Sequence, residues 1–169
     1  MKKIVSYFLI VCTIVTTQFL KENIASAKAV IVDATYVDSV GRSSNFTIPM
    51  IVKLEQTALD QIEITYDRDV DMGQAIKLSN YWIQDTMYAN PKGIATLGKN
   101  DKVNDGNSLA KNRNRVTILS KRGSAKTFII SFNKYIPIGV EYKLTISNVK
   151  VEGASPYYGD NGTVNFVGK

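Results

Sequence analysis

Apolar and polar residues alternate along much of this chain, which is the period of a β-strand with one buried face. The clearest segments are QIEITY at residues 61–66, EYKLTIS at 141–147 and TVNF at 163–166. In each of them every second residue is apolar or aromatic, so one face of the strand is expected to pack on a core. The pattern predicts a protein built mainly of strands.

Segments rich in β-branched and aromatic residues predict further strands. RVTIL at 115–119 and TFIISF at 127–132 are joined by SKRGSAK, which indicates a hairpin. Two earlier candidates are residues 29–37 and 45–55, and Pro49 indicates that the second lies at a sheet edge or carries a bulge.

Residues 73–84 break the alternation and predict a short helical turn near 73–79, followed by a strand at Tyr81-Trp82-Ile83. Seven or eight short strands separated by turns are typical of an all-β fold, an antiparallel β-sandwich. The residues expected in its core are Ile62, Ile64, Tyr66, Trp82, Phe132, Tyr142, Leu144, Ile146 and Phe166.

The first 27 residues have the pattern of a signal peptide. Lys2 and Lys3 precede an apolar run at 4–20, and Ala25-Ser26-Ala27 then supplies a cleavage site. We expect cleavage after Ala27, a product that is secreted or associated with the cell wall, and no stable membrane insertion afterwards. Residues 28–169 then form one domain. The sole cysteine, Cys12, lies in the leader, so this domain has neither a disulfide nor a thiolate zinc site.

Positive charge is concentrated in one part of the chain. Residues 28–169 keep 18 basic and 14 acidic side chains, since three of the 21 basic and one of the 15 acidic residues lie in 1–27. A long loop is predicted at 90–114, and it is either a solvated connection or a binding site for an anionic partner. The candidate binding residues there are Lys99, Lys102, Lys111, Arg113 and Arg115.

Two aromatic pairs are candidates for stacking on sugar rings. Trp82 is assigned to the space between the sheets, because a sandwich interior takes one large aromatic residue. Tyr157 and Tyr158 follow Pro156 in a loop and are the candidates for an exposed sugar platform. The basic loop has almost no interleaved aromatic residues, so no nucleic acid partner is expected.

Asp67, Asp69 and Asp71 stand at alternate positions, as at the start of a calcium loop. An EF-hand needs Gly at position six and Glu at twelve, where this chain has Met72 and Leu78. We interpret the stretch as a strand end with Asp71 as a helix N-cap, and an irregular calcium site remains the weaker alternative.

The chain has no histidine, which excludes Ser-His-Asp and Cys-His catalysis and histidine-bound metals. It also lacks a glycine-rich phosphate loop. Paired carboxylates hydrolyse glycosides, but Glu63 and Glu141 are expected at the surface. The sequence therefore predicts a protein that is not an enzyme and has no cofactor.

Three motifs resemble bacterial immunoglobulin-like domains of S-layer and other surface proteins. They are ITYDRDVD followed by SNYWI, then SFNKYIPIGVEYKLTISNVKVEG, and finally GDNGTVNF, over residues 59–167. In the second motif the matching positions are Ile138, Gly139, Tyr142, Leu144, Ile146 and Val149. The resemblance implies an immunoglobulin-like sandwich, although such domains usually occur in tandem and the loop at 90–114 is longer than expected.

Together these features favour a secreted or cell-surface module that is structural or binds a cell-wall polymer or a surface protein. A carbohydrate-binding module, with weak hydrolysis at most, is the alternative. A secreted inhibitor that presents the long loop to an enzyme is another. The C-terminal sequence has no sorting motif, so any attachment to the wall is expected to be non-covalent.

Overall fold

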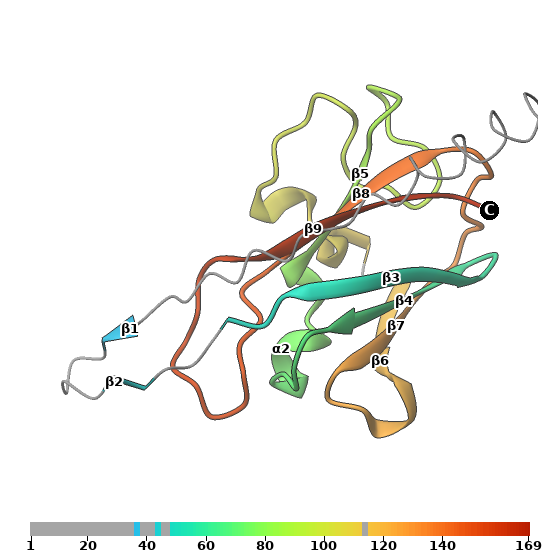
Figure 1. Cartoon of the computed structure of the whole chain (residues 1–169). Helices are drawn as coiled ribbons and strands as arrows, with labels where there is room; N and C mark the ends of the chain where they lie inside the picture. The colour runs from blue at the N-terminus through green and yellow to red at the C-terminus, as the bar shows by residue number, and fades with distance from the viewer. Residues whose placement is uncertain (1–35, 38–42, 45–47, 113–114) are drawn as a thin grey trace, which may run out of the picture. The chain divides into compact units, whose positions relative to one another are not determined.

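The computed structural model describes residues 36–37, 43–44, 48–112 and 115–169. Apart from a short pairing of β1 (Tyr36–Val37) with β2 (Ser43–Ser44), the described strands form two antiparallel sheets (Figure 1). The first has the order β3 (Ile51–Ala58), β4 (Gln61–Tyr66), β7 (Thr127–Phe132), β6 (Val116–Ser120), and the second β5 (Tyr81–Asp85), β8 (Glu141–Ser147), β9 (Asp160–Val167). The predicted all-β architecture is confirmed.

The alternation predicted from the sequence directs side chains of both sheets into one core. On β4, Ile62 and Ile64 lie opposite Ile130 and Phe128 of β7, and all four side chains are buried. Tyr142, Leu144 and Ile146 of β8 complete the core from the other sheet. Phe166 is only partly buried at its margin.

A short helix, α2 (Met72–Ala75), and the 3-10 turn η1 (Leu78–Asn80) lie where the helical turn was predicted. The backbone N–H of Gln74 donates to Oδ1 of Asp71 at 3.0 Å, so Asp71 is the helix N-cap. Three further 3-10 turns are η2 (Asp105–Asn107), η3 (Leu109–Asn112) and η4 (Lys121–Gly123).

Two buried tyrosines join the sheets inside the core. The Tyr81 hydroxyl donates to the Ala75 carbonyl at 2.5 Å and therefore accepts the bond from the Tyr66 hydroxyl, 2.8 Å away. This chain of hydrogen bonds connects β4, β5 and α2, and it satisfies two hydroxyls that have no access to water.

Several expectations concern the N-terminal part of the chain. The predicted signal peptide at 1–27 and most of the candidate strand at 29–37 lie outside the described residues. The candidate strand at 45–55 begins only at Ile51, after Pro49, whose carbonyl accepts a hydrogen bond from the buried Asn161 side chain. Among the described residues no helix is long and apolar enough to span a membrane.

Replacing Leu144 with Ala should lower the free energy of unfolding by about 2–5 kcal/mol, because the transfer and cavity terms add in a closed core. Leu119→Ala is the matched control, since Leu119 is also in a strand but 65% exposed, and its effect should be small. Urea unfolding of both variants measures the difference. Equal losses would contradict the assignment of Leu144 to the core.

Candidate functional site

The long connection between β5 and β6 lies against the outer face of β5. Tyr81 and Ile83 face the core, so Trp82 between them points outward, and its Nε1 donates to the Asn104 carbonyl at 2.8 Å. Trp82 is buried nevertheless, because the connection covers it. The prediction that Trp82 packs between the sheets is therefore wrong, since β5 is buried on both faces.

Gln84 holds the middle of this connection. Its Nε2 donates to the carbonyls of Gly98, Lys99 and Asp101 at 2.9, 3.1 and 3.1 Å. The Asp101 carboxylate in turn accepts the Gly98 N–H at 2.8 Å. These bonds fix the turn at residues 98–101 and provide donors for carbonyls of that turn, which pairs with no strand.

Asp85 holds the beginning of the connection. Its carboxylate is fully buried and accepts the backbone N–H groups of Met87, Tyr88 and Lys92 at 2.8, 2.9 and 3.1 Å. Three such donors offset the cost of placing a carboxylate away from water. Asp85 therefore acts as the anchor of residues 87–92.

Residues 96–97 also pair with the backbone of β5. Leu97 forms a parallel bridge with Gln84, and the Asp85 N–H donates to the Leu97 carbonyl at 2.8 Å. Among the described residues of the predicted loop, strand pairing is limited to this bridge. Gly98 is required next to it, because a Cβ there would lie 1.7 Å from the Ala89 carbonyl oxygen.

Lys99, Lys102 and Lys111, here called the loop lysines, extend from this fixed backbone into solvent. Among the described residues none of them forms an ion pair. Asp101 caps the turn, as described above. The predicted loop is thus a docked segment that presents three unpaired cations. Arg113, the fourth predicted cation, lies outside the described residues.

Arg115 lies apart from the loop lysines, immediately before β6. It lines a pocket of about 120 Å³ together with Pro91, Val116 and residues 93–95 and 132–134. The Arg115 carbonyl accepts the Asn133 N–H at 2.9 Å, which holds the two sides together. The second cation of the pocket is Lys134, which no pattern in the sequence singled out.

Tyr157 and Tyr158 differ in their surroundings. The Tyr157 hydroxyl donates to the Asp160 carbonyl at 2.9 Å, and burial together with the Asp160 carboxylate raises the Tyr157 pKa. Tyr158 is 87% exposed. The Tyr157 side chain is therefore held by a hydrogen bond within its own turn, whereas the Tyr158 ring extends into solvent.

The three aspartates of the calcium alternative have different environments. Burial of Asp67 opposes ionisation, but hydrogen bonds from Arg68 and from the Met50 N–H outweigh it and lower the Asp67 pKa. Asp71 caps α2, and Asp69 is exposed. In the part of the chain that the structure describes, no group of three or more Asp, Glu, Cys or His side chains is arranged to hold a metal.

The two glutamates considered for glycoside hydrolysis belong to different sheets. Glu63 lies on the outer face of β4 and pairs with Lys121 at 2.5 Å, but it is buried there, so the expectation of an exposed Glu63 is wrong. Glu141 begins β8 and accepts a hydrogen bond from Thr86. The fold therefore gives each carboxylate a separate partner.

No known protein family and no curated protein matches this sequence. Among solved structures, the chain is similar to the N-terminal part of the bacterial S-layer protein SbsC, with 13% identity and a TM-score of 0.46 over 72% of this chain and 23% of that one. Two further SbsC structures, rSbsC(31-844) and domains 1–6, have 14% identity and TM-scores of 0.49 and 0.48 over 71% of this chain and 13% of theirs. The chain spans less than a quarter of these S-layer chains, and the likeness concerns the fold.

Gln84→Leu should release the loop, because the carbonyls of Lys99 and Asp101 lose their donor and the Gly98 carbonyl keeps only the Asp101 N–H. We expect a loss of stability on the order of 2–4 kcal/mol. Trypsin should then cut faster at Lys99 and Lys102, and Trp82 fluorescence should shift to the red. Gln61→Leu, on the outer face of β4, is the control. Unchanged cleavage in Gln84→Leu would contradict the docking.

Stability should also fall at alkaline pH. Burial and the Asp85 carboxylate raise the Tyr142 pKa from 10.0 to about 12, and burial raises the pKa of Tyr66 and Tyr81. Between pH 10.0 and about 12 the Tyr142 hydroxyl is ionised in the unfolded chain but still protonated in the folded chain. The contribution of this group to the free energy of unfolding is therefore complete below pH 10.0 and is lost as the pH rises toward 12. Urea midpoints at about pH 8 and about pH 11 measure this. Tyr142→Phe should show a smaller decrease, and an equal decrease would contradict the assignment.

Proposed function

We propose that this chain is an exported, non-enzymatic immunoglobulin-like module that binds an anionic polymer of the cell wall. The observation that carries the proposal is that three loop lysines, none of them in an ion pair among the described residues, extend from a connection that Gln84 and Asp85 hold against β5. The immunoglobulin-like assignment and the location at the cell surface are supported by the motifs between residues 59 and 167.

The docked loop lowers the entropic cost of binding. A loop that moves freely would have to be ordered when a ligand arrives, whereas here the backbone at residues 98–101 is already fixed. Only the lysine side chains lose freedom. Since each lysine is a hydrated point charge without directional preference, the loop suits a flexible chain of repeated anionic groups better than a single rigid anion.

The alternatives have less support from the geometry. A sugar platform would use Tyr157 and Tyr158, but the Tyr157 hydroxyl is hydrogen bonded to its own turn. An inhibitor would insert a protruding loop into an enzyme, whereas this loop lies along the outer face of β5.

Sedimentation with purified cell walls tests the proposal. Binding through exposed lysines is electrostatic, so it should weaken steeply as the Debye length falls from about 10 Å at 0.1 M salt to about 3 Å at 1 M. The variant Lys99→Gln/Lys102→Gln/Lys111→Gln should bind at least about tenfold more weakly than the unmodified chain at low salt.

The matched control is Lys53→Gln/Lys77→Gln/Lys126→Gln, which removes the same charge from other parts of the surface. This control should keep most of the binding. Equal loss in both triple variants would show that net charge is responsible rather than the loop, and the absence of binding by the unmodified chain would reject the proposal.

A further inference from the structure

One end of the sandwich exposes large apolar side chains at the tips of its loops. The end consists of the β3–β4 turn, the connection at residues 133–140 and residues 168–169 (Figure 1). Leu59 in the turn is 57% exposed, and Tyr135 and Ile138 in the connection are 72% and 79% exposed. Side chains of this size are usually covered, and their grouping on neighbouring loops points to a function.

The backbone beneath these side chains is held in place. The Ile136 N–H donates to the Leu59 carbonyl at 2.7 Å, and the Gly139 N–H donates to the Gly168 carbonyl at 2.9 Å. Ile136 itself is buried in the core. The three apolar side chains therefore extend from anchored loops, which cannot fold back to cover them.

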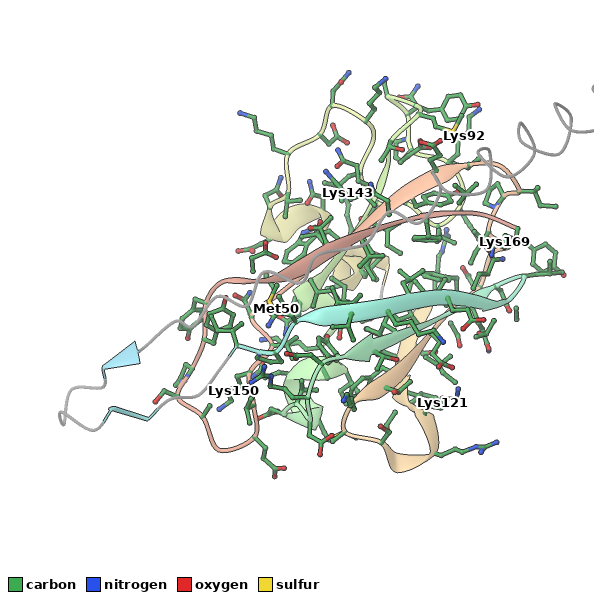
Figure 2. All side chains as sticks on the ribbon, in the orientation of Figure 1. Met50, Lys92, Lys121, Lys143, Lys150 and Lys169 are labelled. Carbon is green, nitrogen blue, oxygen red and sulfur yellow. The ribbon has the colours of Figure 1, made fainter. Side chains whose placement is uncertain are left out.

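Cations and carboxylates both lie near this apolar tip, and two of the cations line a pocket beside it. Figure 2 shows Lys92 and Lys169 toward this end of the sandwich, with Met50 and Lys150 toward the other. Arg115 and Lys134 line the pocket, and Lys92 lies over the Tyr88 ring at 3.5 Å from its centroid. The cations of this end are Lys92, Arg115, Lys134 and Lys169, and its carboxylates are Asp60, Glu141 and the buried Asp85. Glu55, which forms an ion pair with Lys53, also lies close enough to Lys169 to interact with it.

The pocket beside the tip has an apolar floor and a charged rim. Ile94 and Phe132 are buried at its base, while Arg115 and Lys134 are exposed at its edge. Its volume of about 120 Å³ is sufficient for one phosphate group with the first atoms of its ester. Arg and Lys at such a rim would meet phosphate oxygens with charge-assisted hydrogen bonds.

We propose that this end docks on the surface of a bilayer that contains anionic phospholipid. Tyr135, Ile138 and Leu59 enter the boundary between headgroups and acyl chains, where tyrosine and aliphatic side chains are both favourable. Arg115 and Lys134 bind the phosphate of a lipid headgroup at the pocket. The negative potential of the membrane surface attracts the other lysines of this end. The contact is superficial and does not span the membrane.

A lipid surface fits this end better than a protein does. The apolar side chains stand on separate loop tips, whereas a stable protein interface needs about 1,000 Å² of closely complementary surface. A second copy of this chain would also bring Arg115 and Lys134 of both copies, the cations of the pocket, face to face. A bilayer requires no shape match, and its phosphates complement those cations.

Vesicle flotation tests the proposal with the full exported chain. Vesicles of phosphatidylglycerol with phosphatidylcholine should carry the protein, and phosphatidylcholine alone should bind about tenfold less. Tyr135→Ser/Ile138→Ser should weaken binding to the anionic vesicles by about tenfold or more, because both apolar contacts are lost. Lys134→Gln should weaken it less and make it less sensitive to salt.

The matched control is Leu119→Ser/Tyr158→Ser, which removes one aliphatic residue and one tyrosine that are 65% and 87% exposed outside this end. Urea midpoints show whether each variant remains folded. The proposal is overturned if the two double variants bind alike, or if the unmodified chain does not bind anionic vesicles. Soluble glycerol phosphate provides a further test. If it saturates the protein at the same concentration as lipid, and if Tyr135→Ser/Ile138→Ser does not change that binding, the pocket is a site for small anions and the membrane proposal is overturned.

Discussion

The hydrogen bonds of the buried Gln84 amide and Asp85 carboxylate are the constraint on which the docking of the long loop against β5 depends. A long connection laid on a sheet brings many backbone N–H and carbonyl groups out of water, and each needs a partner. These two consecutive residues supply both kinds, because the amide donates to carbonyls at 98–101 and the carboxylate accepts from N–H groups at 87–92. The segments that carry Lys99 and the pocket residue Pro91 are therefore supported by two adjacent side chains.

Strands with one face against the core and one toward solvent were predictable from alternation, as β4 and β8 show. β5 was predicted to be a strand, but the environment of its outward residues was not. A tryptophan at position 82 is equally compatible with the core between the sheets and with a position under a loop on the outer face of β5. Both positions are buried and favour an apolar ring, so the sequence does not distinguish them. Polar Gln84 has no signal of burial, since its partners are carbonyls remote in the sequence.

Most cations of the candidate site were recognisable from the density of basic residues in the sequence. Which of them belong to the loop and which to the pocket was not predictable. Whether Arg115 joins the loop lysines or the pocket depends on the pairing of β6 with β7, which places it beside Asn133. Lys134 comes from a different segment and reaches the same pocket only through that pairing. Charge patterning along a chain does not contain this tertiary information, whereas helix capping by Asp71 is local and was predictable.

The bridge between Leu97 and β5 has a consequence for self-association. A strand at the margin of a sheet offers unpaired N–H and carbonyl groups to any other chain, which is a common start of aggregation. Residues 96–97 occupy those groups on β5. A relative or an engineered form with a shortened loop would thus uncover a strand able to recruit other copies, so the length of this loop is constrained by solubility as well as by its lysines.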